Sequence, residues 1–195
     1  MHSTAERRLT VYPSFVLLLC LLIWLDKDGW VPLFFCSAAL HECGHLLALR
    51  LCNVPVYGME LRAAGAVIRT GATTAGREAL CTAAGPLVNL VLSALLFQLA
   101  PKGSLINLLL LCFNLLPVYP LDGGRLLRLL LCRLFGQQGE RISQIIAVLF
   151  ALTAAVIAVV QTCVCHRGLY PCLAAAAVLC RLPNTPCKIR RMRLK

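Results

Sequence analysis

The chain alternates between long apolar runs and short polar breaks. The breaks at 26–29 and 101–104 read DKDG and PKGS, and Gly and Pro at such points are typical of turns between helices. A helix that crosses a bilayer needs about 20 predominantly apolar residues. The pattern therefore predicts an all-α membrane protein with about six transmembrane helices, at residues 13–25, 30–51, 79–100, 104–121, 142–162 and 168–182.

Two segments do not follow this pattern. Residues 54–71 contain β-branched residues, glycines and rough alternation, which predicts short strands. We therefore expect a short membrane-associated β segment after the second helix. Residues 125–135 (RLLRLLLCRLF) are basic and amphipathic, which indicates a continuation of the fourth helix along the membrane interface. The expected organisation is one membrane core, residues 1–182, followed by a basic cytoplasmic tail, residues 183–195.

The composition supports a membrane protein. The 195 residues are 59% hydrophobic and only 14% charged, and the mean hydropathy is +0.81. Soluble domains are nearer half apolar and a quarter charged. We therefore expect an integral membrane protein for which the lipid bilayer is a constant partner.

The net charge of +11 indicates orientation rather than a nucleic-acid partner. With the predicted spans, all but three of the 19 Lys and Arg residues fall on the side of the two termini. Loops on the cytoplasmic side of membrane proteins carry this excess of basic residues. The charge therefore predicts cytoplasmic termini and excludes nucleic-acid binding as the reason for the basic composition.

Only a few ionisable side chains fall inside apolar helices or at their edges. Among the eight acidic residues these are Glu42 and Asp122, and among the four histidines they are His41 and His45. A charged acid in the bilayer core costs at least about 2.5–3.5 kcal/mol, so such groups face one another or a water-filled cavity. Both sets lie close to predicted cytoplasmic boundaries. We therefore expect the four residues to meet in the cytoplasmic half of the membrane.

The spacing of these residues predicts a catalytic zinc site. Positions i and i+4 share one helical face, so His41 and His45 can present two imidazoles to one ion. Glu42 lies beside the first ligand and is placed to act as a general base, as in H-E-x-x-H metalloproteases. Two His ligands and one carboxylate, Asp122, leave an open position on Zn²⁺ for a water. Such a site lowers the pKa of that water and polarises a carbonyl, which indicates amide hydrolysis.

Three other interpretations remain open from the residues alone. The histidines can be structural side chains satisfied by their neighbours, with Glu42 as a hydrogen-bonding partner. The chain can be a small zinc-binding membrane transporter, although residues 13–100 and 104–182 show no second His-containing segment of the kind that internal repeats would give. It can also be a catalytically idle binding protein.

Three motifs carry a resemblance to a known family: HECGH at 41–45, AAGPLVNL at 83–90 and FNLLPVYPLDGG at 113–124. With them the chain resembles the site-2 protease family of intramembrane zinc metalloproteases, and most of all the bacterial stage IV sporulation protease subgroup. The resemblance implies that His41, His45 and Asp122 are the zinc ligands and that Glu42 is the catalytic base.

The same resemblance implies supporting residues. Asn89 belongs to the element G-P-x-x-N, and Asn114 and Pro117 to the element N-x-x-P. Asn114 is suited to hydrogen-bond an extended peptide or support the metal site, and Pro117 breaks the helix before Asp122. A hydrogen bond between helices explains Asn89 equally well. We expect these three residues to bind substrate or to support the site.

The resemblance also implies partners and location. We expect a membrane-associated protein substrate, such as a membrane-tethered sigma-factor precursor, cut close to the cytoplasmic face. The expected location is a bacterial cell membrane or the membrane that surrounds the forespore. The chain shows neither the nucleotide-sensing domain nor the PDZ domain of other members, so its regulation cannot be inferred by analogy. A regulatory membrane protein is a candidate partner. The sequence gives no oligomeric state.

Two further expectations concern the segment 54–71 and the cysteines. A substrate helix must unwind before its amides can be attacked, and a strand edge in 54–71 would pair with the extended substrate. Most of the 12 cysteines lie in apolar stretches, where free Cys behaves as a small hydrophobic residue. Cys163, Cys165 and Cys172 cluster near one loop, where a disulfide is conceivable.

Overall fold

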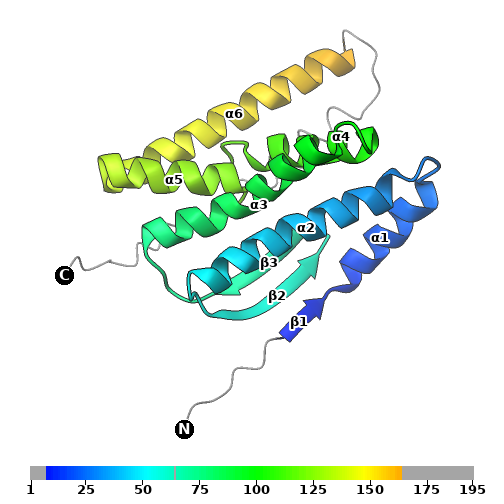
Figure 1. Ribbon diagram of the computed structural model, residues 1–195. Helices are drawn as coiled ribbons and strands as arrows, with labels where there is room; N and C mark the ends of the chain where they lie inside the picture. Colours follow the sequence, from blue (N-terminus) through cyan, green and yellow to red (C-terminus); the bar gives the residue numbers. More distant parts are fainter. Residues whose placement is uncertain (1–7, 64, 164–195) are drawn as a thin grey trace. The chain divides into compact units, whose positions relative to one another are not determined.

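The computed structural model describes residues 8–63 and 65–163. The chain divides into two compact units, with the boundary between Leu115 and Leu116, and each unit is described here by itself. Figure 1 gives the order of the elements along the chain. The sixth predicted span, 168–182, the tail, 183–195, and the side chains of Cys163, Cys165 and Cys172 lie outside the described part.

The described residues of the first unit, 8–63 and 65–115, form four helices. The predicted bounds of the first two spans are confirmed. The helix α3 begins earlier than predicted, because Thr74 caps its first turn by accepting from the Arg77 N–H, and it also ends earlier, at Leu96. The break at 101–104 is not a turn: Pro101 opens α4, since Pro is well suited to the first helical position. The helices are α1 (Pro13–Leu25), α2 (Trp30–Leu51), α3 (Ala75–Leu96) and α4 (Pro101–Asn114).

The start of α2 is fixed by the turn before it. Both carboxylate oxygens of Asp26 accept backbone N–H groups at the helix start, from Trp30 and from Val31, each at 3.0 Å. The hydrogen bond from Val31 is the main cause that lowers the pKa of Asp26 below its ordinary value. Gly29 adopts a left-handed conformation (φ 72°), which a residue with a side chain rarely takes. These features hold the His-containing helix at a defined starting point.

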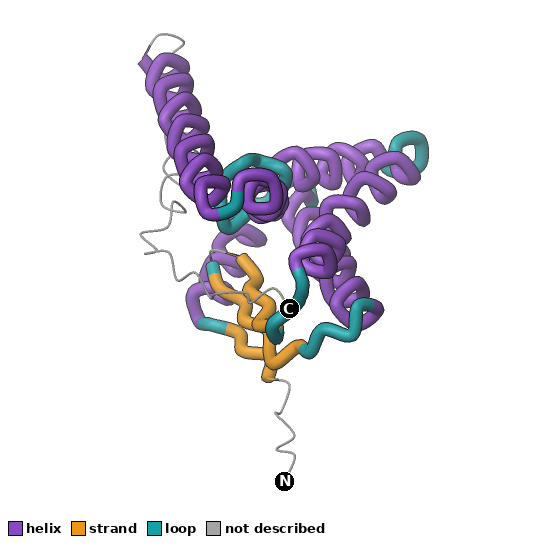
Figure 2. The backbone as a smooth tube through the Cα atoms, turned by 90° about the vertical axis from the view of Figure 1, so that its left-hand side faces the viewer, coloured by secondary structure: helices purple, strands orange, loops and turns teal. Residues whose placement is uncertain are grey.

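A three-stranded sheet lies in the first unit, as Figure 2 shows. It confirms the strands predicted in 54–71, which form an antiparallel hairpin, while β1 was not predicted. The strand order is β1-β2-β3, with β1 parallel to β2, so β3 lies at an edge. The strands are β1 (Arg8–Val11), β2 (Val56–Arg62) and β3 (Gly65–Thr70).

An ion-pair network around one buried carboxylate joins the strands of this sheet. Glu60 on β2 is buried and accepts from Arg62 at 2.6 Å, and it also pairs with Arg69 on β3. Arg62 in turn donates to the Tyr12 hydroxyl, next to β1, at 3.3 Å and lies over the Tyr12 ring. Side chains from all three chain segments are thus tied to one carboxylate, which fixes the hairpin beside the start of α1.

The helices α2 and α3 approach each other closely. A Cβ built on Gly44 of α2 would lie 2.8 Å from Val88 Cγ2 and 3.0 Å from the Ala84 carbonyl oxygen of α3. Small residues at such a crossing let the two backbones pack against each other, as in many membrane helix pairs. A small buried apolar cluster packs against the hairpin. Its members are Leu49, Val54 and Cys81.

Residues 116–163, the described part of the second unit, contain two helices that pack together, α5 (Asp122–Phe135) and α6 (Gln137–Cys163). The prediction that 125–135 continues the fourth helix is wrong, and so is the end of that helix at 121. The chain leaves α4 after Asn114 and begins a separate helix at Asp122. Pro117 and Pro120 explain this break, because proline lacks an N–H donor and disfavours a helical residue before it. The predicted span 142–162 lies within α6.

Three of the described helices are long and apolar enough to cross a membrane: Trp30–Leu51, Ala75–Leu96 and Gln137–Ala158. The helix α1 is apolar but has only 13 residues. Large apolar side chains are exposed on these helices, and Leu17 and Trp24 of α1 are 71% and 81% exposed. An apolar exterior of this kind fits lipid rather than water. The helices support an integral membrane protein, while the predicted total of about six spans is only partly represented.

Candidate metal centre

Two histidines of α2 face each other at the centre of the first unit. His41 and His45 are buried, and their Nε2 atoms lie 3.1 Å apart. The rings meet edge to face, with centroids 4.7 Å apart and an interplanar angle of 85°. One helical turn separates the two residues, which is why they share a face. The pair predicted from the i, i+4 spacing is therefore present.

The hydrogen bond of His45 Nδ1 determines which ring nitrogen of His45 carries the hydrogen. Its Nδ1–H donates to the backbone oxygen of Cys81 at 2.8 Å, and that oxygen can only accept. In the neutral ring the lone pair then lies on Nε2, directed toward His41. A backbone carbonyl that fixes the tautomer in this way is a common support of metal-binding histidines. The pair is therefore arranged as ligands for a cation.

Gly85 of α3 leaves the space that the two imidazoles occupy. A Cβ built there would overlap His45 Nε2 and would lie 2.6 Å from His45 Cε1 and 2.7 Å from His41 Cε1. Real Cβ atoms do not approach other atoms so closely. The glycine in the G-P-x-x-N element is thus required by the positions of both rings.

We expect Gly85→Ala to displace the His pair and to lower zinc affinity by about 10- to 100-fold, the range seen when the immediate surroundings of metal ligands are disturbed. Zinc competition with a chromogenic chelator measures the effect. Gly76→Ala on the same helix is the matched control, because a Cβ at Gly76 meets nothing within 4 Å. Equal zinc affinity in the two variants would show that Gly85 does not position the rings.

Glu42 follows His41 in α2 and is partly buried. The helix turns by about 100° per residue, so Glu42 lies beside the face of the His pair rather than on it. Its role as a base beside the ligands, and not as a ligand, stays a prediction.

In the second unit, Asp122 is the first residue of α5 and is 6% exposed. A carboxylate in the first turn of a helix is stabilised by the helix dipole. The preceding loop is tight, because a Cβ on Gly124 would overlap the backbone of Val118 and Tyr119. The prediction that Asp122 ends the fourth helix is corrected: it begins the next one.

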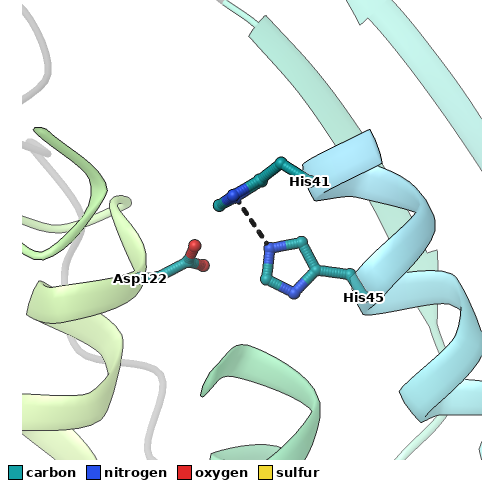
Figure 3. A group of neighbouring side chains, drawn as sticks. All are labelled: His41, His45 and Asp122. Carbon is teal, nitrogen blue, oxygen red and sulfur yellow. Dashed lines mark hydrogen bonds between the residues drawn. The ribbon is translucent and has the colours of Figure 1, made fainter. Parts of the chain in front are cut away.

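His41, His45 and Asp122 form a group that can hold a metal ion, with one ligand atom of each residue within 4.8 Å of the others and all three residues buried. Figure 3 draws these three side chains together. Two imidazole nitrogens and one carboxylate are a donor set that suits Zn²⁺ and leaves a position open for water or substrate.

The three predicted supporting residues lie in different places. Asn89 is in α3, one turn after Gly85, and is fully buried. Asn114 is the last residue of α4 and its amide donates to the Leu110 carbonyl at 3.0 Å. Pro117 lies in the loop before α5 and is partly buried. Their roles toward substrate stay predictions.

The carbonyl of Cys81, which orients His45, was not predicted from the sequence. A backbone acceptor has no residue-type signature, so no pattern could have indicated it. Ser37 and Asn107, whose side chains hydrogen-bond each other inside the helix bundle, were not predicted either. Polar residues in apolar helices are costly, so their positions carried a signal, but the prediction rested on ionisable residues alone.

Comparison with known proteins gives a consistent result. Residues 98–158 match the model described as Peptidase family M50. A solved structure, the site-2 protease from Methanocaldococcus jannaschii, superposes with a TM-score of 0.69 and 24% sequence identity over 93% of this chain and 92% of that chain. The two chains therefore share a fold.

Two relatives align with parts of the chain. A zinc metalloprotease of Methanocaldococcus jannaschii is 31% identical over 152 residues, which is 70% of this chain and 45% of the relative. Rip3 of Mycobacterium tuberculosis is 34% identical over 131 residues, which is 58% of this chain and 33% of the relative. The chain thus aligns with less than half of the length of either relative.

Proposed function

We propose that this chain, for which the family model, the relatives and the solved fold together support peptidase family M50, is an intramembrane zinc metalloprotease. The observation that carries the proposal is the buried group of His41, His45 and Asp122 beside Glu42. In this proposal the two histidines and Asp122 hold one Zn²⁺, and Glu42 is the general base.

The chemistry follows from these roles. When bound, Zn²⁺ lowers the pKa of a water and polarises the scissile carbonyl. Glu42 accepts the proton of the attacking water and returns it to the leaving amine, as a positioned carboxylate does in general acid–base catalysis. The Cys81 carbonyl holds His45 in the tautomer that presents Nε2. Asn89 is fully buried and supports the site, whereas Asn114 and Pro117 support the site or bind substrate.

The proposed substrate is a membrane-associated protein segment cut close to the cytoplasmic face, with both termini of the enzyme in the cytoplasm. The likeness of the motif FNLLPVYPLDGG to the stage IV sporulation subgroup supports a finer proposal. In it, the enzyme lies in the bacterial cell membrane or the membrane around the forespore. The substrate is then a membrane-tethered sigma-factor precursor or another regulator, and a regulatory membrane protein controls the cleavage.

Peptide turnover and metal flux distinguish this function from the transporter alternative. Purified protein in zinc-loaded proteoliposomes is expected to cut a co-reconstituted tethered substrate while luminal zinc stays constant. Zinc efflux without fragments would favour a transporter and contradict the proposal. Co-expression with candidate tethered regulators, followed by gel analysis of fragments, identifies the substrate to reconstitute.

We also propose that β3 binds the unwound substrate by strand addition. Its position at the edge of the sheet supports this, because an edge strand presents unpaired N–H and C=O groups. In an antiparallel pair, adjacent residues direct their N–H groups to opposite sides of the strand.

Proline at Val67 and at Ile68, tested separately, should therefore have different effects. The variant that removes an N–H from the open edge is expected to lose most cleavage at an unchanged unfolding temperature, because the ladder with β2 remains. The variant that removes an N–H bonded to β2 is expected to have both a lower cleavage rate and a lower unfolding temperature. Cleavage rates and thermal unfolding of both variants measure this, and unchanged cleavage in both would exclude β3 as the substrate strand.

A further inference from the structure

Polar side chains from three helices lie buried at one level of the first unit. They are Ser37 of α2, Asn89 of α3 and Asn107 of α4, which are 6%, 0% and 1% exposed. None of them carries a charge. We call these three residues the amide cluster.

The hydrogen bonds within the amide cluster are incomplete. The Asn107 amide donates both of its N–H groups, to Ser37 Oγ at 3.1 Å and to the Gly103 carbonyl at 2.9 Å. Its Oδ1 has no partner among the described residues. Asn89 has none in that part of the chain for either Oδ1 or Nδ2. Two acceptors and one donor group are therefore left open.

The helix register brings the open groups to the same level. Ser104 Oγ donates to the Ser93 carbonyl at 2.7 Å, which aligns the end of α3 with the start of α4. From this contact, Asn89 is four residues back along α3, about 6 Å, and Asn107 is three residues forward along α4, about 4.5 Å. The two helices run in opposite directions because a short connection joins them. Asn89 and Asn107 therefore both lie on the same side of the Ser93–Ser104 contact.

A second register places the amide cluster relative to the His pair. Gly85 touches both imidazoles, and Asn89 follows it by one helical turn on the same face of α3. Ser37 precedes His41 by one turn on α2. The cluster therefore lies one turn from the His pair, on the side of the amino-terminal end of α2.

Buried amide groups without partners are rare in native proteins, because each costs the free energy of removing it from water. Ordered water is the usual partner, and a buried water typically makes two to four hydrogen bonds. Neutral donors and acceptors do not select a cation or an anion, and a fully buried position does not admit a peptide. Water is the ligand that fits this chemistry.

We propose that the amide cluster binds an ordered water molecule between α3 and α4. The water donates to Asn107 Oδ1 and to Asn89 Oδ1, or accepts from Asn89 Nδ2, and so satisfies Asn107 Oδ1 and one end of the Asn89 amide. This water site is distinct from the metal centre and lies one helical turn away from the His pair.

The proposal is tested by whether asparagine-to-leucine substitutions lower or raise the midpoint of thermal unfolding. Leucine has nearly the shape of asparagine and no polar atoms, so we compare Asn89→Leu, Asn107→Leu and the double variant by thermal unfolding in detergent. If the two amides share a water, each single change lowers the unfolding midpoint and the double change lowers it by less than the sum. A rise of the midpoint in Asn89→Leu would mean that the amide is dry and unpaired, which overturns the proposal.

An experimental structure supplies a second readout that does not depend on the folding of variants. The proposal predicts a water peak within about 2.7–3.2 Å of Asn89 and of Asn107 Oδ1. A direct hydrogen bond between the two amides with no water between them would overturn it. Neither readout uses peptide cleavage, so the result is independent of the proposed function.

Discussion

Replacing Glu42 with Gln is expected to reduce cleavage of a tethered substrate by about 10²–10⁴-fold, the contribution typical of a general base. Gln keeps the shape of the side chain but cannot accept the proton of the attacking water. Because Glu42 is not one of the proposed ligands, zinc content should stay at the wild-type level. Fragment formation by the purified variant and zinc content by mass spectrometry measure the two effects.

Cys43→Ala is the matched control for this variant. Cys43 follows Glu42 on the same helix and is exposed, so its loss should change neither cleavage nor zinc content. Cleavage by Glu42→Gln at the rate of Cys43→Ala would remove Glu42 from the mechanism. Loss of zinc from Glu42→Gln would instead make it a ligand and contradict the assignment of roles.

Asp122→Asn is expected to lower zinc affinity by more than the 10- to 100-fold typical of changes around metal ligands, and to abolish cleavage. The amide has the size of the carboxylate but lacks the negative charge that a zinc ligand supplies. Chelator competition measures the affinity. Asp28→Asn, in the exposed turn before α2, controls for the general loss of an acidic group.

The two variants differ in what they should preserve. Glu42→Gln keeps zinc and loses catalysis, whereas Asp122→Asn loses both. Wild-type zinc affinity in Asp122→Asn would leave the His pair as the whole protein contribution to the ion. The carboxylate would then have another role, and the hydrolase proposal would lose its third ligand.

The sequence predicted the helices best where apolar length and turn residues agree. The bounds of α1 and α2 match because DKDG is a polar turn between them and Gly29 takes a left-handed conformation. Prediction failed at 101–121. Pro101 was interpreted as part of a turn although it starts α4. The apolar run through Leu121 placed the end of the predicted span too late, although Pro117 already indicated a break before Asp122 and the helix ends at Asn114. Hydropathy has no information about where a proline interrupts hydrogen bonding.

The candidate site was predictable in its residue types but not in its supports. An i, i+4 spacing in a helix places His41 and His45 on one face, but it does not set the ring orientations that bring their Nε2 atoms to 3.1 Å. The carbonyl that fixes His45 and the space above Gly85 depend on how α3 packs against α2. Tertiary packing of that kind cannot be derived from one sequence.

The central claim is that His41, His45 and Asp122 bind one and the same Zn²⁺. Anomalous diffraction at the zinc absorption edge from crystals of the wild-type protein tests it most directly. The account predicts a single anomalous peak at about 2.0–2.2 Å from one nitrogen of each histidine and one carboxylate oxygen of Asp122. A peak that is bound by the two histidines but lies beyond bonding distance of Asp122, or a peak elsewhere in the chain, would contradict it.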